Sequence, residues 1–137
     1  MSGKTLVGVL VVTHGRLGHE LVKAAEMIVE DQAHIESFSL GWHNDVEKSK
    51  AKIARAVESV DKGKGVIILT DMFGGTPSNL SLPLLEKGKL EIITGVNLPM
   101  VIKLANQSGK ESFEELAKKV KEQGQSQIAI ASQLLGE

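Results

Sequence analysis

The chain has 137 residues, no cysteine and four histidines, and its 16 basic and 17 acidic side chains give a net charge of -1. Without cysteine, a disulfide framework, a thiolate nucleophile and a cysteine zinc site are excluded. The nearly balanced charge gives no electrostatic basis for binding nucleic acid or an anionic membrane. Because 42% of the residues are apolar and 24% charged, we expect residues 1–137 to form one globular domain.

The first predicted element is a buried strand at residues 6–12, a continuous apolar run. Seven residues are too few for a membrane span, and no small-residue cleavage site follows them, so they do not form a signal peptide. We therefore expect the protein to be cytoplasmic.

The other strands are predicted by further short apolar runs. Residues 66–69 have the continuous pattern of a strand that is buried on both faces of a parallel sheet. The run at 35–40 is mixed, which favours an edge position. Weaker runs predict strands at 90–94 and 128–131.

Helical periodicity and capping residues predict the elements between these strands. Asn44 and Glu47 have capping-box spacing at the start of a helix over 45–60. The helix before it has a predicted apolar stripe at Leu17, Leu21, Ala24, Ala25 and Ile28.

The later helices begin at recognisable caps. One begins at Thr76-Pro77, and Pro83 should kink or end it. A short helix opens at Asn97, and the last one has Ser112 and Glu115 as a capping box and Gly124 as its expected end.

Strands that alternate with helices predict an α/β fold with a parallel, doubly wound sheet and helices on both faces. For a chain of this size the expected strand order is 2-1-3-4, with residues 128–131 as a C-terminal edge strand. This order places the first and third strands side by side, so the loops at their carboxyl ends should meet.

Those two loops carry His14 and Asp71, which are 57 positions apart in the sequence. In open α/β sheets, ligands bind outside the carboxyl ends of the strands, where the strand order reverses. A carboxylate that accepts a hydrogen bond from one ring nitrogen fixes the imidazole tautomer and leaves the other nitrogen as a nucleophile. The pair also stabilises positive charge on a phosphorylated ring.

The residues that follow Asp71 could hold an anion. Gly74 and Gly75 permit close approach of the backbone, and Thr76 begins a helix whose free N-H groups favour negative charge. Arg16 is a further candidate for contact with phosphate. The predicted reaction is phosphoryl transfer through a phosphohistidine at His14.

The other histidines are weaker candidates. We expect His19 and His34 to be surface residues, whereas His43 follows the second strand on the same sheet edge and is the rival to His14. His14 and His19 lack the i, i+4 spacing of a zinc pair, so no metal site is expected.

Three motifs in order resemble the IIA component of the mannose/fructose/sorbose family of the bacterial sugar phosphotransferase system. They are a Thr-His-Gly sequence at 13–15, an Asp-Met-Phe-Gly-Gly-Thr-Pro sequence at 71–77 and a Gly-Val-Asn-Leu-Pro-Met sequence at 95–100. The resemblance covers nearly the whole chain. It implies a phosphotransferase component that accepts phosphate on Nε2 of His14, with Asp71 facing Nδ1.

The same resemblance implies the partners. The phosphate would come from the histidine-containing phosphocarrier protein and pass to a IIB component on a separate chain. A homodimer is implied, in which the subunits exchange a C-terminal strand at residues 125–132. No metal or organic cofactor is implied.

Three alternatives remain at this point. A receiver domain also carries its phosphorylated residue after the third strand, but it binds magnesium with acidic residues where this chain has Thr13, His14 and Gly15. A IIA-like subunit that serves dihydroxyacetone kinase shares the fold and the histidine. A regulatory sensor of phosphorylation state, not coupled to transport, would have the same residues.

Overall fold

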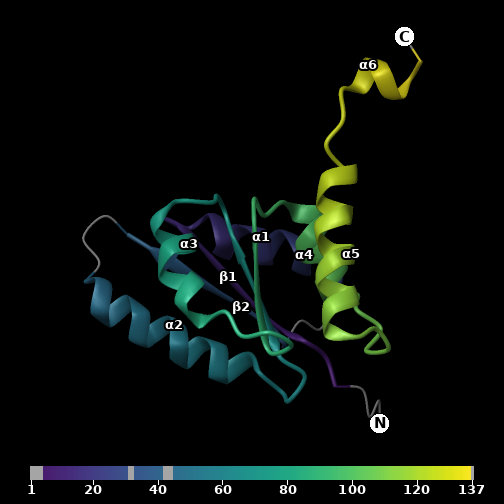
Figure 1. Ribbon diagram of the computed structural model, residues 1–137. Coiled ribbons are helices and arrows are strands. Elements are labelled where there is room, and N and C mark those ends of the chain that lie inside the picture. Colours follow the sequence, from purple (N-terminus) through teal and green to yellow (C-terminus); the bar gives the residue numbers. More distant parts are fainter. Residues whose placement is uncertain (1–4, 31–32, 42–44, 137) are drawn as a thin grey trace.

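A four-stranded parallel sheet forms the centre of the molecule in the computed structural model, which describes residues 5–30, 33–41 and 45–136. The strands lie in the order β2-β1-β3-β4, as predicted, and β2 is at an edge (Figure 1). Their bounds are β1 Gly8–His14, β2 Ile35–Leu40, β3 Val66–Thr70 and β4 Leu90–Thr94.

Helices cover both faces of the sheet, which confirms the predicted layers (Figure 1). Side chains alternate between the faces along each strand, so Val9 and Val11 lie in one core and Leu10 and Val12 in the other. The first core is shared with α1 Leu17–Glu26, α4 Leu98–Ala105 and α5 Phe113–Ser126, and the second with α2 Val46–Val60 and α3 Thr76–Ser81.

Several predicted helix ends are confirmed. The Ser112 hydroxyl accepts a hydrogen bond from the Glu115 amide at 3.1 Å, and Asn97 caps α4 through the Met100 amide at 3.3 Å. α3 ends at Ser81 and continues as a 3-10 turn, η1 Leu82–Leu84, so Pro83 ends the α-helix as expected.

Two helix boundaries differ from the prediction. α2 is capped by Asp45, which accepts a hydrogen bond from the Lys48 amide at 3.0 Å, whereas Asn44 lies outside the described residues. α5 passes through Gly124, because that residue serves packing rather than termination. A Cβ on Gly124 would lie 2.6 Å from the Met100 sulfur, so the glycine lets α5 approach α4.

The apolar stripe of α1 is rotated from the predicted one. Gly18, Val22 and Ala25 are its buried residues, whereas Leu17 and Ile28 are exposed. Packing of the helix against β2, β1 and α4, rather than the number of apolar residues on one face, sets this orientation.

The expectation that His34 is a surface residue was wrong. His34 is buried, and its Nε2 lies 3.1 Å from the carbonyl oxygen of Leu104. The two residues are 70 positions apart, so no local pattern reveals the contact. His19 is half-buried on α1, and His43 lies outside the described residues.

The edge strand predicted at 128–131 was also wrong, since the described part of the chain has four strands. Residues 128–130 have no regular structure, and α6 Ala131–Leu134 follows them. This C-terminal segment extends away from the sheet (Figure 1). A strand needs a neighbouring strand to satisfy its backbone groups, and the segment has none where it lies.

Across the three described ranges, every helix is too short or too polar to cross a membrane.

Replacing Gly8 with alanine should destabilise the fold more than replacing Gly124. A Cβ on Gly8 would overlap the Val60 carbonyl, a backbone atom at the end of α2 that cannot rotate away. We expect Gly8→Ala to lower the free energy of unfolding in urea by about 2–3 kcal/mol.

Gly124→Ala is the matched comparison. Its nearest neighbours are atoms of the flexible Met100 side chain, and alanine gains roughly 1 kcal/mol over glycine within a helix. The net change should therefore be below about 1 kcal/mol. If both variants lost the same free energy of unfolding, the contact between β1 and α2 would not be tighter than the contact between α4 and α5.

Candidate functional site

His14 is the last residue of β1, and its neighbours fix the backbone there. The Gly15 amide donates to the Leu40 carbonyl at 2.8 Å, and the buried Thr13 hydroxyl accepts a hydrogen bond from the Gly18 amide at 2.7 Å. The sequence analysis missed this role of Thr13. A lone polar residue at the end of an apolar strand, with a glycine at the start of the next helix, was the available signal.

Asp71 follows β3 and contacts His14 directly, so the predicted proximity is confirmed. Its Oδ2 lies 2.8 Å from the His14 Nδ1 and accepts a hydrogen bond from the His14 backbone amide at 3.0 Å. Its Oδ1 accepts one from the Met72 amide at 3.1 Å. The carboxylate is thus held on both oxygens.

The environment of Asp71 favours its charged form. Burial by itself raises the pKa of the carboxyl. Four effects lower it: hydrogen bonds from the His14 backbone and from the His14 ring, the charge of His14, and a backbone hydrogen bond within Asp71. Together they outweigh burial, so the pKa of Asp71 lies below its usual value. Asp71 is thus a carboxylate at neutral pH, which can only accept hydrogen bonds.

The carboxylate determines which ring nitrogen of His14 is free. Since Asp71 only accepts, the His14 Nδ1 must be the donor, and this assigns the lone pair to Nε2 in the neutral ring. The Nε2 has no hydrogen-bond partner among the described residues. The side chain of His14 is 51% exposed, against 13% for Asp71. The pair therefore presents an oriented nitrogen nucleophile at the surface.

Gly74 and Gly75, in the 71–77 loop, have different structural roles. Gly74 has a positive φ of 87°, a conformation that side chains rarely adopt. Gly75 leaves room for the imidazole, since a Cβ there would lie 2.9 Å from the His14 Cε1 and 3.5 Å from its Nε2. Asn79 holds the end of the loop, because its backbone N-H donates to the Gly75 carbonyl at 2.9 Å and its side-chain amide donates to the Gly74 carbonyl at 3.4 Å.

A cavity of about 650 Å³ lies beside His14. Thr76, the first residue of α3, is exposed and lines it, so this predicted residue and His14 meet at one site. The remaining walls are mainly apolar and come from the end of β2, the first turn of α2 and α3; they include Leu40, Val46, Ser49 and Leu80.

Arg16 precedes α1 and extends along it. Its Nη2 lies 3.5 Å from Oε1 of Glu20, and both side chains are largely exposed. Its predicted contact with phosphate stays a prediction.

Within the described ranges, no three histidine, aspartate or glutamate side chains form a group that could hold a metal ion.

Comparison with known proteins gives a consistent result. A family model described as the PTS system fructose IIA component (EIIA-man) matches residues 8–121. The mannose-specific EIIAB component of Escherichia coli (strain K12) is 33% identical over 121 residues, which cover 80% of this chain and 35% of that protein. The chain therefore spans only 35% of the length of that relative. The sorbose-specific EIIA component of Lacticaseibacillus casei is 28% identical over 119 residues, with 84% and 86% covered.

Solved structures agree with these matches. A mannose/sorbose-specific IIA subunit from Enterococcus faecalis is 27% identical with a TM-score of 0.81, covering 92% of this chain and 95% of its own. The IIA protein associated with a fucose utilization operon of Streptococcus pneumoniae is 26% identical with a TM-score of 0.83, covering 96% and 98%. The chain therefore belongs to the mannose/fructose/sorbose family of phosphotransferase system IIA components.

Proposed function

We propose that the protein is a phosphoryl carrier that accepts phosphate on Nε2 of His14 and passes it on. The donor is the histidine-containing phosphocarrier protein, and the acceptor is a IIB component. The observation that carries this proposal is the 2.8 Å contact between Asp71 Oδ2 and His14 Nδ1 beside an exposed Nε2. Membership of the IIA family supports the direction of transfer.

The transfer balances without a metal or a base. The Nε2 lone pair attacks phosphorus, and the bond from phosphorus to the donor's ring nitrogen breaks, so that the donor leaves as a neutral imidazole. The His14 ring gains positive charge and keeps its Nδ1 proton. The Asp71 carboxylate, 2.8 Å away, stabilises that charge. Onward transfer is the same exchange: the acceptor's nucleophile attacks phosphorus, the bond from phosphorus to Nε2 breaks, and His14 leaves as a neutral imidazole.

The phosphoryl oxygens need donors on the open side of the ring. We assign this role to the backbone around Gly74 and Gly75, the first turn of α3 at Thr76, and Arg16. Gly75 and Thr76 lie beside the ring or its cavity. Arg16 would have to exchange its exposed contact with Glu20 for the phosphate, which costs little because surface ion pairs are weak.

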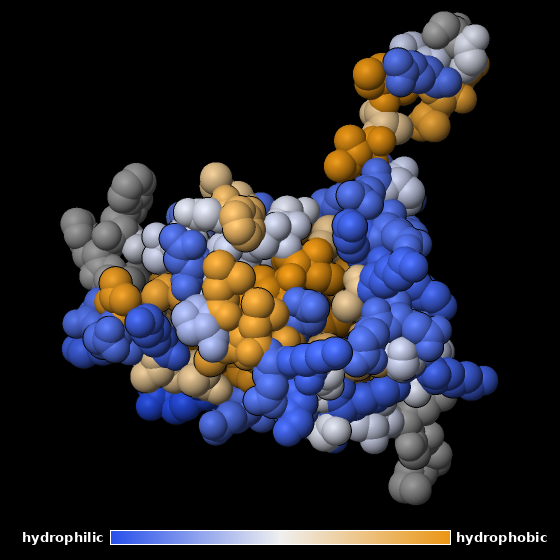
Figure 2. Space-filling view, viewed as in Figure 1, coloured by the Kyte–Doolittle hydropathy of each residue, from blue (hydrophilic) through white to orange (hydrophobic). Residues whose placement is uncertain are grey.

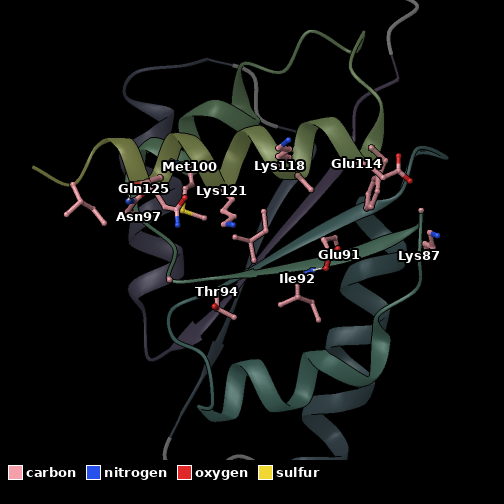
Figure 3. Close-up of a pocket in the computed structure, with 17 residues that line it drawn as sticks. Lys87, Glu91, Ile92, Thr94, Asn97, Met100, Glu114, Lys118, Lys121 and Gln125 are labelled. Carbon is pink, nitrogen blue, oxygen red and sulfur yellow. Dashed lines mark hydrogen bonds between the residues drawn. The ribbon is translucent and has the colours of Figure 1, made fainter.

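We also propose that the protein is a homodimer in which the C-terminal segments are exchanged. β4 is a sheet edge with β3 as its partner among the described strands. A groove of about 840 Å³ lies between β4 and α5, with Lys121 directed toward the strand and Asn97, Met100 and Gln125 at one end (Figure 3). An open edge of this kind accepts a strand from another chain.

The C-terminal segment has the apolar residues that such a strand needs. Ile128 and Ile130 are largely exposed, and so are Leu134 and Leu135 in and after α6. Apolar atoms gather both in the hollow beside α5 and on this segment (Figure 2). Residues 127–130 of a second subunit would cover the edge of β4 in the first subunit.

His14→Ala should abolish phosphorylation. When the protein is incubated with phosphoenolpyruvate, enzyme I and the phosphocarrier protein, we expect one alkali-stable phosphate per chain, mapped to His14 by mass spectrometry. His19→Ala, on the half-buried side of α1, is the control and should be phosphorylated normally. Alkali-stable label on the His14→Ala variant would contradict the assignment.

Asp71→Ala should slow transfer while the fold is retained. Loss of the carboxylate removes both the orientation of the ring and the stabilisation of its charge, and losing the aspartate that holds a catalytic histidine in its tautomer costs up to about 10⁴ in rate. The measurement is the rate of phosphate uptake in a rapid-quench experiment. Asp61→Ala is the control, since Asp61 accepts a turn hydrogen bond from Gly63 at the far end of α2. A wild-type rate for Asp71→Ala would remove its orienting role.

Ile130→Asp should weaken the dimer. A charge on the apolar side of the exchanged strand would be buried against the partner, at a cost of several kcal/mol. We expect wild type to sediment as a dimer and Ile130→Asp as a monomer at equal concentration. Ala129→Asp places the same charge on the neighbouring side chain, which points to the opposite side of an extended strand, and should affect the dimer less. A monomeric wild type would refute the exchange.

A further inference from the structure

The outer edge of β4 is formed by the backbone groups of every second residue. The Lys89 carbonyl accepts a hydrogen bond from the Val66 amide at 2.9 Å, so Lys89 faces β3, and so does every second residue after it. The residues between them, Leu90, Ile92 and Thr94, therefore direct their amides and carbonyls toward the outer side of the sheet.

Two of these edge positions already have partners within the chain. Leu90 forms two backbone hydrogen bonds with Glu86, at 2.8 and 3.1 Å. The Ile92 amide donates to Oε2 of Glu91 at 2.9 Å (Figure 3). A side chain of β4 thus occupies the backbone donor that a neighbouring strand would use.

The Glu91 carboxylate lies in the groove between β4 and α5. Glu91 is one of the residues that line this groove, and it shares a face of the sheet with Ile93, which packs against the first core. Charged side chains on edge strands are a common means of preventing other strands from pairing there. A carbonyl that approached the Ile92 amide would meet a negative charge already bound to it.

We propose that Glu91 controls the exchange of C-terminal strands, because its carboxylate competes with the strand of a second copy for the Ile92 amide. This inference rests on the proposed homodimer. In the single chain the carboxylate holds the amide, and it must release the amide before the second copy can pair with β4.

The length of the edge fits this occupant. Leu90 is closed by Glu86, so residues 91–94 are the part of β4 that can pair with another strand. Residues 127–130 of the second copy match that length and carry the exposed Ile128 and Ile130. Pairing at Ile92 then replaces a hydrogen bond to a carboxylate with one to a backbone carbonyl, so the loss of the first bond weakens the dimer.

Glu91→Ala should tighten the dimer. Without the carboxylate, pairing no longer requires the loss of a hydrogen bond to a charged acceptor, and we expect the Kd of the dimer to fall about tenfold. The measurement is sedimentation equilibrium over a range of protein concentrations. Glu36→Ala is the matched control, since Glu36 lies on β2 at the opposite edge and its carboxylate accepts a hydrogen bond from the Ser59 hydroxyl at 2.8 Å. It should leave the Kd unchanged.

Hydrogen exchange tests the contact itself in the single chain. In the Ile130→Asp chain, expected to be monomeric, Glu91→Ala should lower the protection factor of the Ile92 amide about tenfold. Glu36→Ala should leave it unchanged. Equal protection with and without Glu91 would overturn the proposed competition.

The oligomeric state separates the two proposals. If wild type is a dimer and Glu91→Ala leaves its Kd unchanged or raises it, the role of Glu91 is wrong and the exchange stands. If wild type and Glu91→Ala are both monomers at every concentration, the exchange is wrong and the role of Glu91 fails with it. A monomeric wild type with a dimeric Glu91→Ala variant would support the competition most strongly.

Discussion

The hydrogen bond between the His14 Nδ1 and the Asp71 Oδ2 is the interaction on which the site depends. At 2.8 Å it joins an exposed imidazole to a carboxylate whose two oxygens accept three hydrogen bonds in all. The bond fixes which nitrogen carries the proton and therefore which one is nucleophilic. Under the proposed function, it also provides the negative charge that stabilises the ring once the ring is phosphorylated. Reversible carriage of phosphate requires both effects.

The fold holds this bond in place through the strand order. β1 and β3 are hydrogen-bonded neighbours, with Val12 opposite Thr70, so Asp71, one residue beyond β3, lies beside the end of β1, where its Oδ2 reaches His14. Thr13 anchors the start of α1 beneath His14, and Gly75 leaves room beside the ring. The ring is therefore held on its Nδ1 side by Asp71 and exposed on the side where, under the proposed function, the phosphoryl group arrives.

The sequence could predict the site because its determinants are local or topological. Alternation of elements gives a parallel sheet, the strand order places His14 beside Asp71, and the caps at Asn97 and Ser112 act within one helical turn. What could not be predicted depends on contacts between distant segments. His34 is buried because the Leu104 carbonyl, 70 positions away, accepts its hydrogen bond. Gly124 serves packing of α5 on Met100, although the same residue type commonly ends a helix.

The C-terminal segment is a second case in which the structure depends on contacts that the sequence pattern does not reveal. The apolar pattern of residues 128–131 is suited to a strand, but a strand exists only where a neighbouring edge pairs with it. In the described chain this segment has no such neighbour, while β4 beyond Leu90, which bridges to Glu86, has no second strand on its outer side. The apolar pattern thus predicted a strand, but under the proposed exchange the strand that it pairs with is β4 of a second copy of the chain.

The most direct measurement of the central claim is the tautomer of His14 in the unphosphorylated protein. Two-bond ¹H-¹⁵N correlation of the ¹⁵N-labelled protein, recorded at a pH where the ring is neutral, distinguishes a protonated ring nitrogen from one with a lone pair. The account predicts that Nδ1 carries the proton and Nε2 the lone pair. A His14 ring that is protonated at Nε2 would contradict it, because the nitrogen assigned to attack phosphorus would then have no free electron pair.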